Sequence, residues 1–86
     1  MAPAPPNFPC DYALKLLGRR SVEFRERMLA VLALHANAAP LLEVGERLSR
    51  DGSYVSLSCT LRVDSREQLE RIYADLYATG LVLYAL

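Results

Sequence analysis

The ten residues from Tyr54 to Val63 (YVSLSCTLRV) constrain the fold more than any other part of this chain, because their polarity alternates strictly. In an extended strand, successive side chains point to opposite faces. The alternation therefore predicts a strand with one buried face and one open face. The buried face would carry the apolar residues Val55, Leu57, Cys59, Leu61 and Val63.

Three further segments have the patterns of strands. The Asp-Gly pair at 51–52 is typical of a hairpin turn and predicts a partner strand over 41–48, with Leu42, Val44 and Leu48 in alternation interrupted by Glu46. Residues 10–18 (CDYALKLLG) predict a first strand that ends at Gly18, with Tyr12, Leu14 and Leu16 on one face. The final residues, LVLYAL, predict a last strand with Val82, Tyr84 and Leu86 on one side.

Two helices separate these strands. Ser21 is a suitable N-cap for a helix of about four turns. That helix would carry one apolar stripe and end before Asn37–Pro40. Ser65 and Gln68 match a capping box, and Gly80 supplies a stop for the second helix. The stripes consist of Phe24, Met28, Val31, Leu32 and His35 in the first helix and Leu69, Ile72, Tyr73 and Leu76 in the second.

The element order predicts a ferredoxin-like α+β sandwich (βαββαβ). Its four-stranded antiparallel sheet has the order fourth, first, third, second strand, with both helices on one face. Residues 10–86 would form this single domain. Residues 1–9 (MAPAPPNFP) contain four prolines and predict an arm that is flexible or laid over the surface.

The chain also resembles the YbeD-like family of small bacterial proteins, which are often labelled lipoate-regulatory and have no assigned biochemical activity. The resemblance runs from Phe8 to Leu86 and rests on Phe8-Pro9, Lys15 with Gly18, Phe24, His35, Ser49 with Gly52-Ser53-Tyr54 and Ser56, Gln68, and Val82 to Leu86. It implies the same fold, which is similar to the ACT-type regulatory domains that bind amino acids. It also implies a link to lipoate metabolism.

Composition excludes several classes of function. The 86 residues include ten basic and ten acidic side chains, and 52% are hydrophobic. A net charge of zero argues against broad phosphate neutralisation and against an anionic membrane surface. No segment has the roughly 20 apolar residues of a membrane span, and the N-terminus lacks a secretory pattern. Two cysteines are too few for a disulfide scaffold, so we expect a cytoplasmic protein.

The open face of the predicted sheet is the candidate binding site. The first and third strands are central neighbours, so Lys15 would lie among hydroxyl groups that can hold an anionic or carboxylate ligand. Serine and threonine are also common on any solvated sheet face, and a partner protein could use the same surface. The candidate residues are Lys15, Tyr54, Ser56, Ser58, Thr60 and Arg62.

The remaining reactive side chains form no catalytic or metal-binding set. His35 has no carboxylate or thiol at ligand spacing and is expected to be a partly buried structural residue. Cys59 should face the core opposite Leu14, which is too far from Cys10 for a disulfide. Cys10 is expected to be exposed, but nothing near it would activate its thiol. No cofactor or metal is implied.

We therefore predict a non-enzymatic regulatory or adaptor domain that binds a partner protein or a small carboxylate ligand. The second and fourth strands are sheet edges, which also allows a homodimer. The first alternative is a small phosphate-handling enzyme, because acylphosphatases share the fold. Arg19, Arg20 or Arg25 would then bind phosphate, but the glycine-rich loop and the asparagine of the second strand are missing. The second alternative is weak RNA binding, which a neutral chain with few exposed aromatics does not favour.

Overall fold

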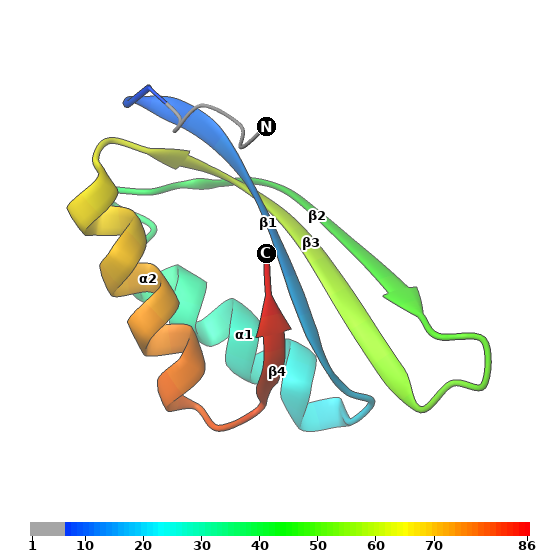
Figure 1. The fold of residues 1–86 in the computed structure, drawn as a ribbon. Coiled ribbons are helices and arrows are strands. Elements are labelled where there is room, and N and C mark those ends of the chain that lie inside the picture. The colour runs from blue at the N-terminus through cyan, green and yellow to red at the C-terminus, as the bar shows by residue number, and fades with distance from the viewer. Residues whose placement is uncertain (1–6) are drawn as a thin grey trace, which may run out of the picture.

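The computed structural model describes residues 7–86 and confirms the predicted order of elements (Figure 1). The two helices have 13 residues each, and three of the strands have eight or more. The elements are β1 (Cys10–Arg19), α1 (Val22–Leu34), β2 (Leu41–Leu48), β3 (Tyr54–Val63), α2 (Arg66–Ala78) and β4 (Val82–Ala85).

The sheet has the strand order β2-β3-β1-β4, and all three pairings are antiparallel. Both helices lie on one side of it, so the ferredoxin-like fold is confirmed (Figure 1). In the central β1–β3 ladder, Leu14 lies opposite Cys59, and Cys10 lies opposite Val63. Both cysteines are free, as the predicted register requires.

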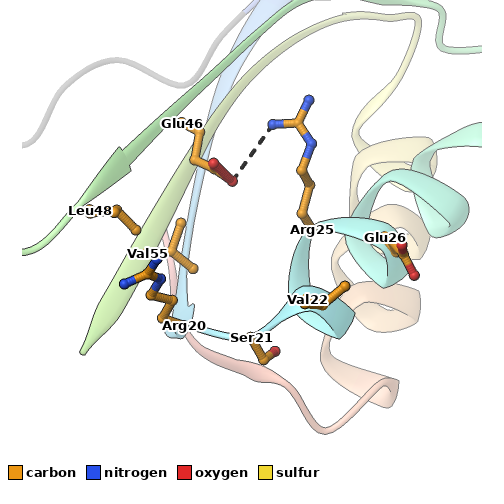
Figure 2. A pocket seen from close by; sticks show the side chains of 8 residues that line it. All are labelled: Arg20, Ser21, Val22, Arg25, Glu26, Glu46, Leu48 and Val55. Carbon is orange, nitrogen blue, oxygen red and sulfur yellow. Dashed lines mark ion pairs between the residues drawn. The ribbon is translucent and has the colours of Figure 1, made fainter. Parts of the chain in front are cut away.

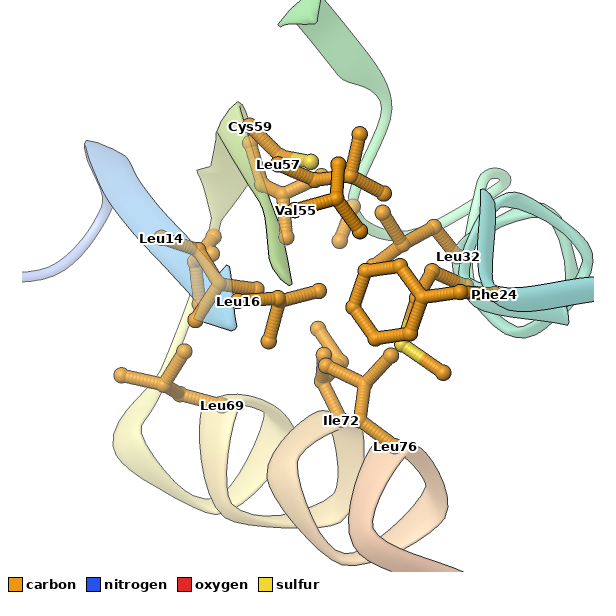
Figure 3. Close-up of a cluster of buried hydrophobic side chains, with 14 residues drawn as sticks. Leu14, Leu16, Phe24, Leu32, Val55, Leu57, Cys59, Leu69, Ile72 and Leu76 are labelled. Atoms are coloured by element: carbon orange, nitrogen blue, oxygen red, sulfur yellow. The ribbon is translucent and has the colours of Figure 1, made fainter. Parts of the chain in front are cut away.

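The hydrophobic core fills the space between the sheet and the helices (Figure 3). All five apolar side chains of β3 that the alternation assigns to one face are buried there. The helical stripes supply the opposite wall of the core through the buried residues Phe24, Met28 and Leu32 of α1 and Leu69, Ile72 and Leu76 of α2.

Gly18 does not end β1, contrary to the prediction; the strand continues to Arg19 and pairs with the start of β3. A Cβ atom on Gly18 would lie 2.2 Å from Cε1 of Phe24, whose ring is 1% exposed. The glycine therefore lets the first turn of α1 pack directly on the sheet, since any larger residue would displace the ring.

The predicted caps begin both helices. The Ser21 hydroxyl accepts the Phe24 N–H (3.0 Å), and the Ser65 hydroxyl accepts the Gln68 N–H (3.2 Å). The capping box is not fully reciprocal, because Oε1 of Gln68 accepts the N–H of Asp64 (2.8 Å) rather than that of Ser65. The Gln68 side chain is nevertheless buried, and its amide oxygen has the hydrogen-bond partner that a buried polar atom needs.

Irregular pairing at the two edge strands changes which side chains face the core. The β1–β4 register shifts between Leu17 and Gly18, so Val82 and Ala85 pack against the core while Tyr84 lies opposite Leu17 on the open face. The prediction that Val82 shares a face with Tyr84 is therefore wrong. A second irregularity, between Leu41 and Glu43 in β2, leaves Leu42 exposed.

The proposed N-terminal arm lies mostly outside the described residues. Residues 7–9 are the part of it that can be placed, and the half-buried Phe8 ring packs against the core. Across residues 7–86, no helix has the length and apolar character needed to cross a membrane.

Candidate functional site

The open face of the sheet, on the side away from the helices, is built from cross-strand rows of side chains. Residues that lie directly opposite one another in antiparallel strands point to the same face. Leu86 joins its row because it exchanges two backbone hydrogen bonds with Lys15, of 2.9 and 3.1 Å. The three middle rows are Tyr84–Leu17–Ser56–Arg47, Leu86–Lys15–Ser58–Gly45 and Ala13–Thr60–Glu43.

Lys15 lies at the centre of this face, and three shallow hollows border it. No carboxylate of residues 7–86 forms an ion pair with its ammonium group. The hollow of about 290 Å³ between Lys15 and β4 combines this cation with a hydroxyl and apolar walls. Its lining residues are Lys15, Leu17, Ser56, Tyr84 and Leu86.

Of the six predicted site residues, five line the three hollows around Lys15 and one, Arg62, does not. Ser56 and Ser58 occupy the rows at and beside Lys15, and Thr60 follows in the next. Arg62 lies at the far end of the face, where its guanidinium pairs with the Asp11 carboxylate at 3.1 Å. Tyr54 lies toward the opposite end, across from Arg19, and it lines one of the three hollows together with Lys15 and Ser56. The structure therefore places Lys15 with Tyr54, Ser56, Ser58 and Thr60 around the three hollows and separates Arg62 from them.

Three apolar residues of the site were not among the predicted ones. Leu17, Tyr84 and Leu86 have exposed fractions of 37%, 57% and 58%. Exposed apolar side chains gathered on one patch are informative in a way that scattered ones are not. The sequence offered one signal for this patch: Leu17 is apolar although it alternates with the buried face of the first strand and so lies on the open face.

A larger hollow, of about 590 Å³, lies elsewhere, between the start of α1 and the edge strand β2 (Figure 2). Arg20 and Arg25 line it, but so do Glu26 and Glu46. Arg25 reaches across the hollow to Glu46, with 3.6 Å between the charged atoms. Because each arginine is matched by a carboxylate, the hollow lacks the excess positive charge that a phosphate site needs.

His35 has an acidic neighbour that its sequence surroundings do not reveal. Its Nε2 lies 2.7 Å from Oδ2 of Asp75, which comes from α2, forty residues further along the chain. Its side chain is half-buried beside the core, as predicted for a structural histidine. Among the described residues, no three His, Cys, Asp or Glu side chains are grouped to hold a metal ion.

The two thiols differ in their surroundings. Burial raises the pKa of the Cys59 thiol above its ordinary value, and the charge of Arg25 offsets part of this effect. Cys59 therefore carries little thiolate at neutral pH, which is the nucleophilic form. Cys10 is partly exposed at the start of β1.

Fold and site together describe a small α+β domain with a mixed polar and apolar sheet face. Residues 5–86 match the model of a family described as "Protein of unknown function (DUF493)", so the chain belongs to that family. A UPF0250 protein of Paraburkholderia phytofirmans is 39% identical over 70 residues, covering 81% of this chain and 79% of that protein. A UPF0250 protein of Vesicomyosocius okutanii is 34% identical over 80 residues, covering 93% and 87%. These bacterial relatives confirm the resemblance to YbeD-like proteins.

Among solved structures, the chain is similar to the C-terminal domain of the MgtC protein from Mycobacterium tuberculosis. The TM-score is 0.72, and the match covers 88% of this chain and 82% of that one. The sequence identity is 18%, so the similarity concerns the fold alone.

Proposed function

We propose that this protein is a non-catalytic regulatory domain whose open sheet face binds a carboxylate attached to a short apolar body. The observation that carries the proposal is the position of Lys15. It is a cation without an ion-pair partner in residues 7–86, and it borders a hollow whose other walls are mainly Leu17, Tyr84 and Leu86.

The two halves of this hollow favour the two halves of such a ligand. An ammonium group and a nearby hydroxyl can both donate hydrogen bonds to a carboxylate, and bonds to charged groups are the stronger ones. When an apolar body covers the exposed leucine and tyrosine side chains, the binding free energy becomes more favourable by about 25 cal/mol per Å² of apolar surface removed from water. A bare acetate ion would use only the first of these contributions.

A regulatory role is favoured over catalysis because, among residues 7–86, neither the Ser56 nor the Ser58 hydroxyl forms a hydrogen bond to Lys15 or to another base. Ser56 and Ser58 lie beside a lysine with no histidine or carboxylate in the same rows. The family resemblance adds a candidate ligand, since lipoate is a carboxylic acid on a short apolar chain. In this role the domain would act in the cytoplasm, where its two free cysteines stay reduced.

Calorimetric titration with octanoate, lipoate, octanamide and acetate tests the proposal. We expect the two chain-bearing acids to bind at least about tenfold more tightly than octanamide, which lacks the charge, or acetate, which lacks the apolar body. N-acetyl-leucine serves as a further ligand that represents the C-terminus of a partner protein.

The relative affinities decide the source of the ligand. Preference for octanoate or lipoate assigns the face to a small acid, and preference for N-acetyl-leucine assigns it to a protein terminus. Equal binding of octanoate and octanamide would overturn the role given to Lys15.

A further inference from the structure

The two edges of the sheet differ in their capacity to add another strand. At the β4 edge, Lys15 and Leu86 form a narrow pair, in which two opposite residues exchange both backbone hydrogen bonds. The neighbouring residue Ala85 therefore points its backbone N–H and C=O groups away from β1, toward the free edge. The Ala85 N–H donates a hydrogen bond to the Tyr77 hydroxyl of α2, at 3.2 Å. β4 is also only four residues long and has an irregular register. The β4 edge is therefore poorly suited to pairing with another chain.

The β2 edge is longer and has no such cover among the described residues. The Ser49 N–H donates to the Tyr54 carbonyl at 2.9 Å, which marks these two residues as a narrow pair. Narrow pairs recur at every second residue of an antiparallel ladder, so Arg47, Gly45 and Glu43 also bond toward β3. The N–H and C=O groups of Val44, Glu46 and Leu48 consequently point to the free edge.

The charges along β2 favour one way of pairing this edge with a second copy. A two-fold axis at Gly45 places Glu43 of each copy opposite Arg47 of the other, which forms two oppositely charged cross-strand pairs. Both side chains are exposed, and neither forms an ion pair with another residue in 7–86. An axis at Glu46 instead places the two Glu46 side chains opposite each other. An axis at Arg47 places the two Arg47 side chains opposite each other.

The same arrangement is also favourable for the neighbouring residues. Gly45 has no side chain, and nothing lies within 4 Å of where its Cβ would be, so the two strands can approach at the axis. At the end of this pairing, Leu42, which lies at the irregularity between Leu41 and Glu43, comes close to Leu48 of the other copy; their exposed fractions are 54% and 44%. Both apolar side chains would be partly removed from water.

We infer that the protein associates with a second copy of itself through antiparallel pairing of the two β2 strands about Gly45. The two four-stranded sheets then form one continuous sheet of eight strands. The open faces lie on the same side of this sheet, and the Arg47 side chains at the junction contribute to both. This inference does not depend on the proposed carboxylate ligand.

Sedimentation velocity with charge-swapped variants tests the inference. We expect a concentration-dependent dimer in the wild type between about 10 µM and about 1 mM, which corresponds to a binding free energy of roughly −4 to −7 kcal/mol. Arg47→Glu should raise the dimer dissociation constant at least about tenfold, because it places Glu43 opposite an acidic residue twice. The double variant Glu43→Arg/Arg47→Glu restores both pairs and should restore the dimer.

Arg71→Glu on α2 is the matched control, with the same charge reversal away from the edge, and should dimerise like the wild type. Circular dichroism establishes that each variant is folded. A wild type that remains monomeric at 1 mM would overturn the inference. So would an Arg47→Glu variant that dimerises like the wild type, or a double variant that stays as weak as Arg47→Glu alone.

Discussion

Replacing Gly18 by alanine is expected to destabilise the fold by about 2–3 kcal/mol. The new Cβ would lie 2.2 Å from Cε1 and 2.5 Å from Cδ1 of the Phe24 ring. That ring is fully buried between β1 and α1, so it can move only by displacing other core side chains. Alanine has less backbone freedom than glycine in the unfolded chain and so loses less entropy on folding, which offsets at most about 1 kcal/mol of this cost. Urea unfolding followed by circular dichroism measures the change.

Two further variants separate the steric effect from a general intolerance of alanine in the sheet. At a protein concentration too low for β2 pairing, Gly45→Ala adds the same methyl group where nothing lies within 4 Å, and should be neutral or stabilise the fold by about 0.5–1 kcal/mol. In a Phe24→Leu background, Gly18→Ala should cost less than in the wild type, because the obstructing ring is absent. A Gly18→Ala variant that is as stable as the wild type would show that the ring does not depend on the glycine.

Replacing Lys15 by methionine is expected to weaken octanoate binding by about 10- to 100-fold. Methionine keeps much of the length and apolar character of the side chain but removes the ammonium group. A hydrogen bond to a charged group contributes about 1.5–3 kcal/mol, and each 1.4 kcal/mol corresponds to a factor of ten in affinity. Calorimetric titration of the wild type and the variant under identical salt conditions measures the difference.

Arg62→Met is the matched control for this prediction. Arg62 belongs to the same face, but its charge is already paired with Asp11 at 3.1 Å. Its removal should change octanoate affinity by less than about twofold, because long-range effects of exposed charges are screened. If Lys15→Met binds octanoate as tightly as the wild type, or if the two variants weaken binding equally, Lys15 is not the specific anchor.

The regular parts of the fold could be predicted from local sequence, since burial imposes a period that the sequence records. The alternation in β3 and the spacing of Phe24, Met28 and Leu32 in α1 identified buried residues correctly. The register that places Cys59 opposite Leu14 followed from the topology of the fold. In each case one repeating pattern determines many positions at once.

The candidate site could be predicted only in part, because irregular pairing and long-range contacts shape it. The register shift between Leu17 and Gly18 brings Tyr84 to the open face but Val82 to the core, which simple alternation in LVLYAL cannot express. The contact between His35 and Asp75 joins residues on different helices. Gly18 was interpreted as a strand end because its partner, the Phe24 ring, arrives from the next element.

The location of carboxylate binding is the most direct test of the proposed function. A titration of the ¹⁵N-labelled protein with octanoate, followed by ¹H–¹⁵N correlation spectra, reports this location residue by residue. We expect saturable shifts to be largest at the amides of Lys15, Leu17, Ser56 and Tyr84, which border one hollow on the open face. Shifts centred on Arg20 and Arg25 at the start of α1, or no saturable shifts, would contradict a carboxylate site on the open face.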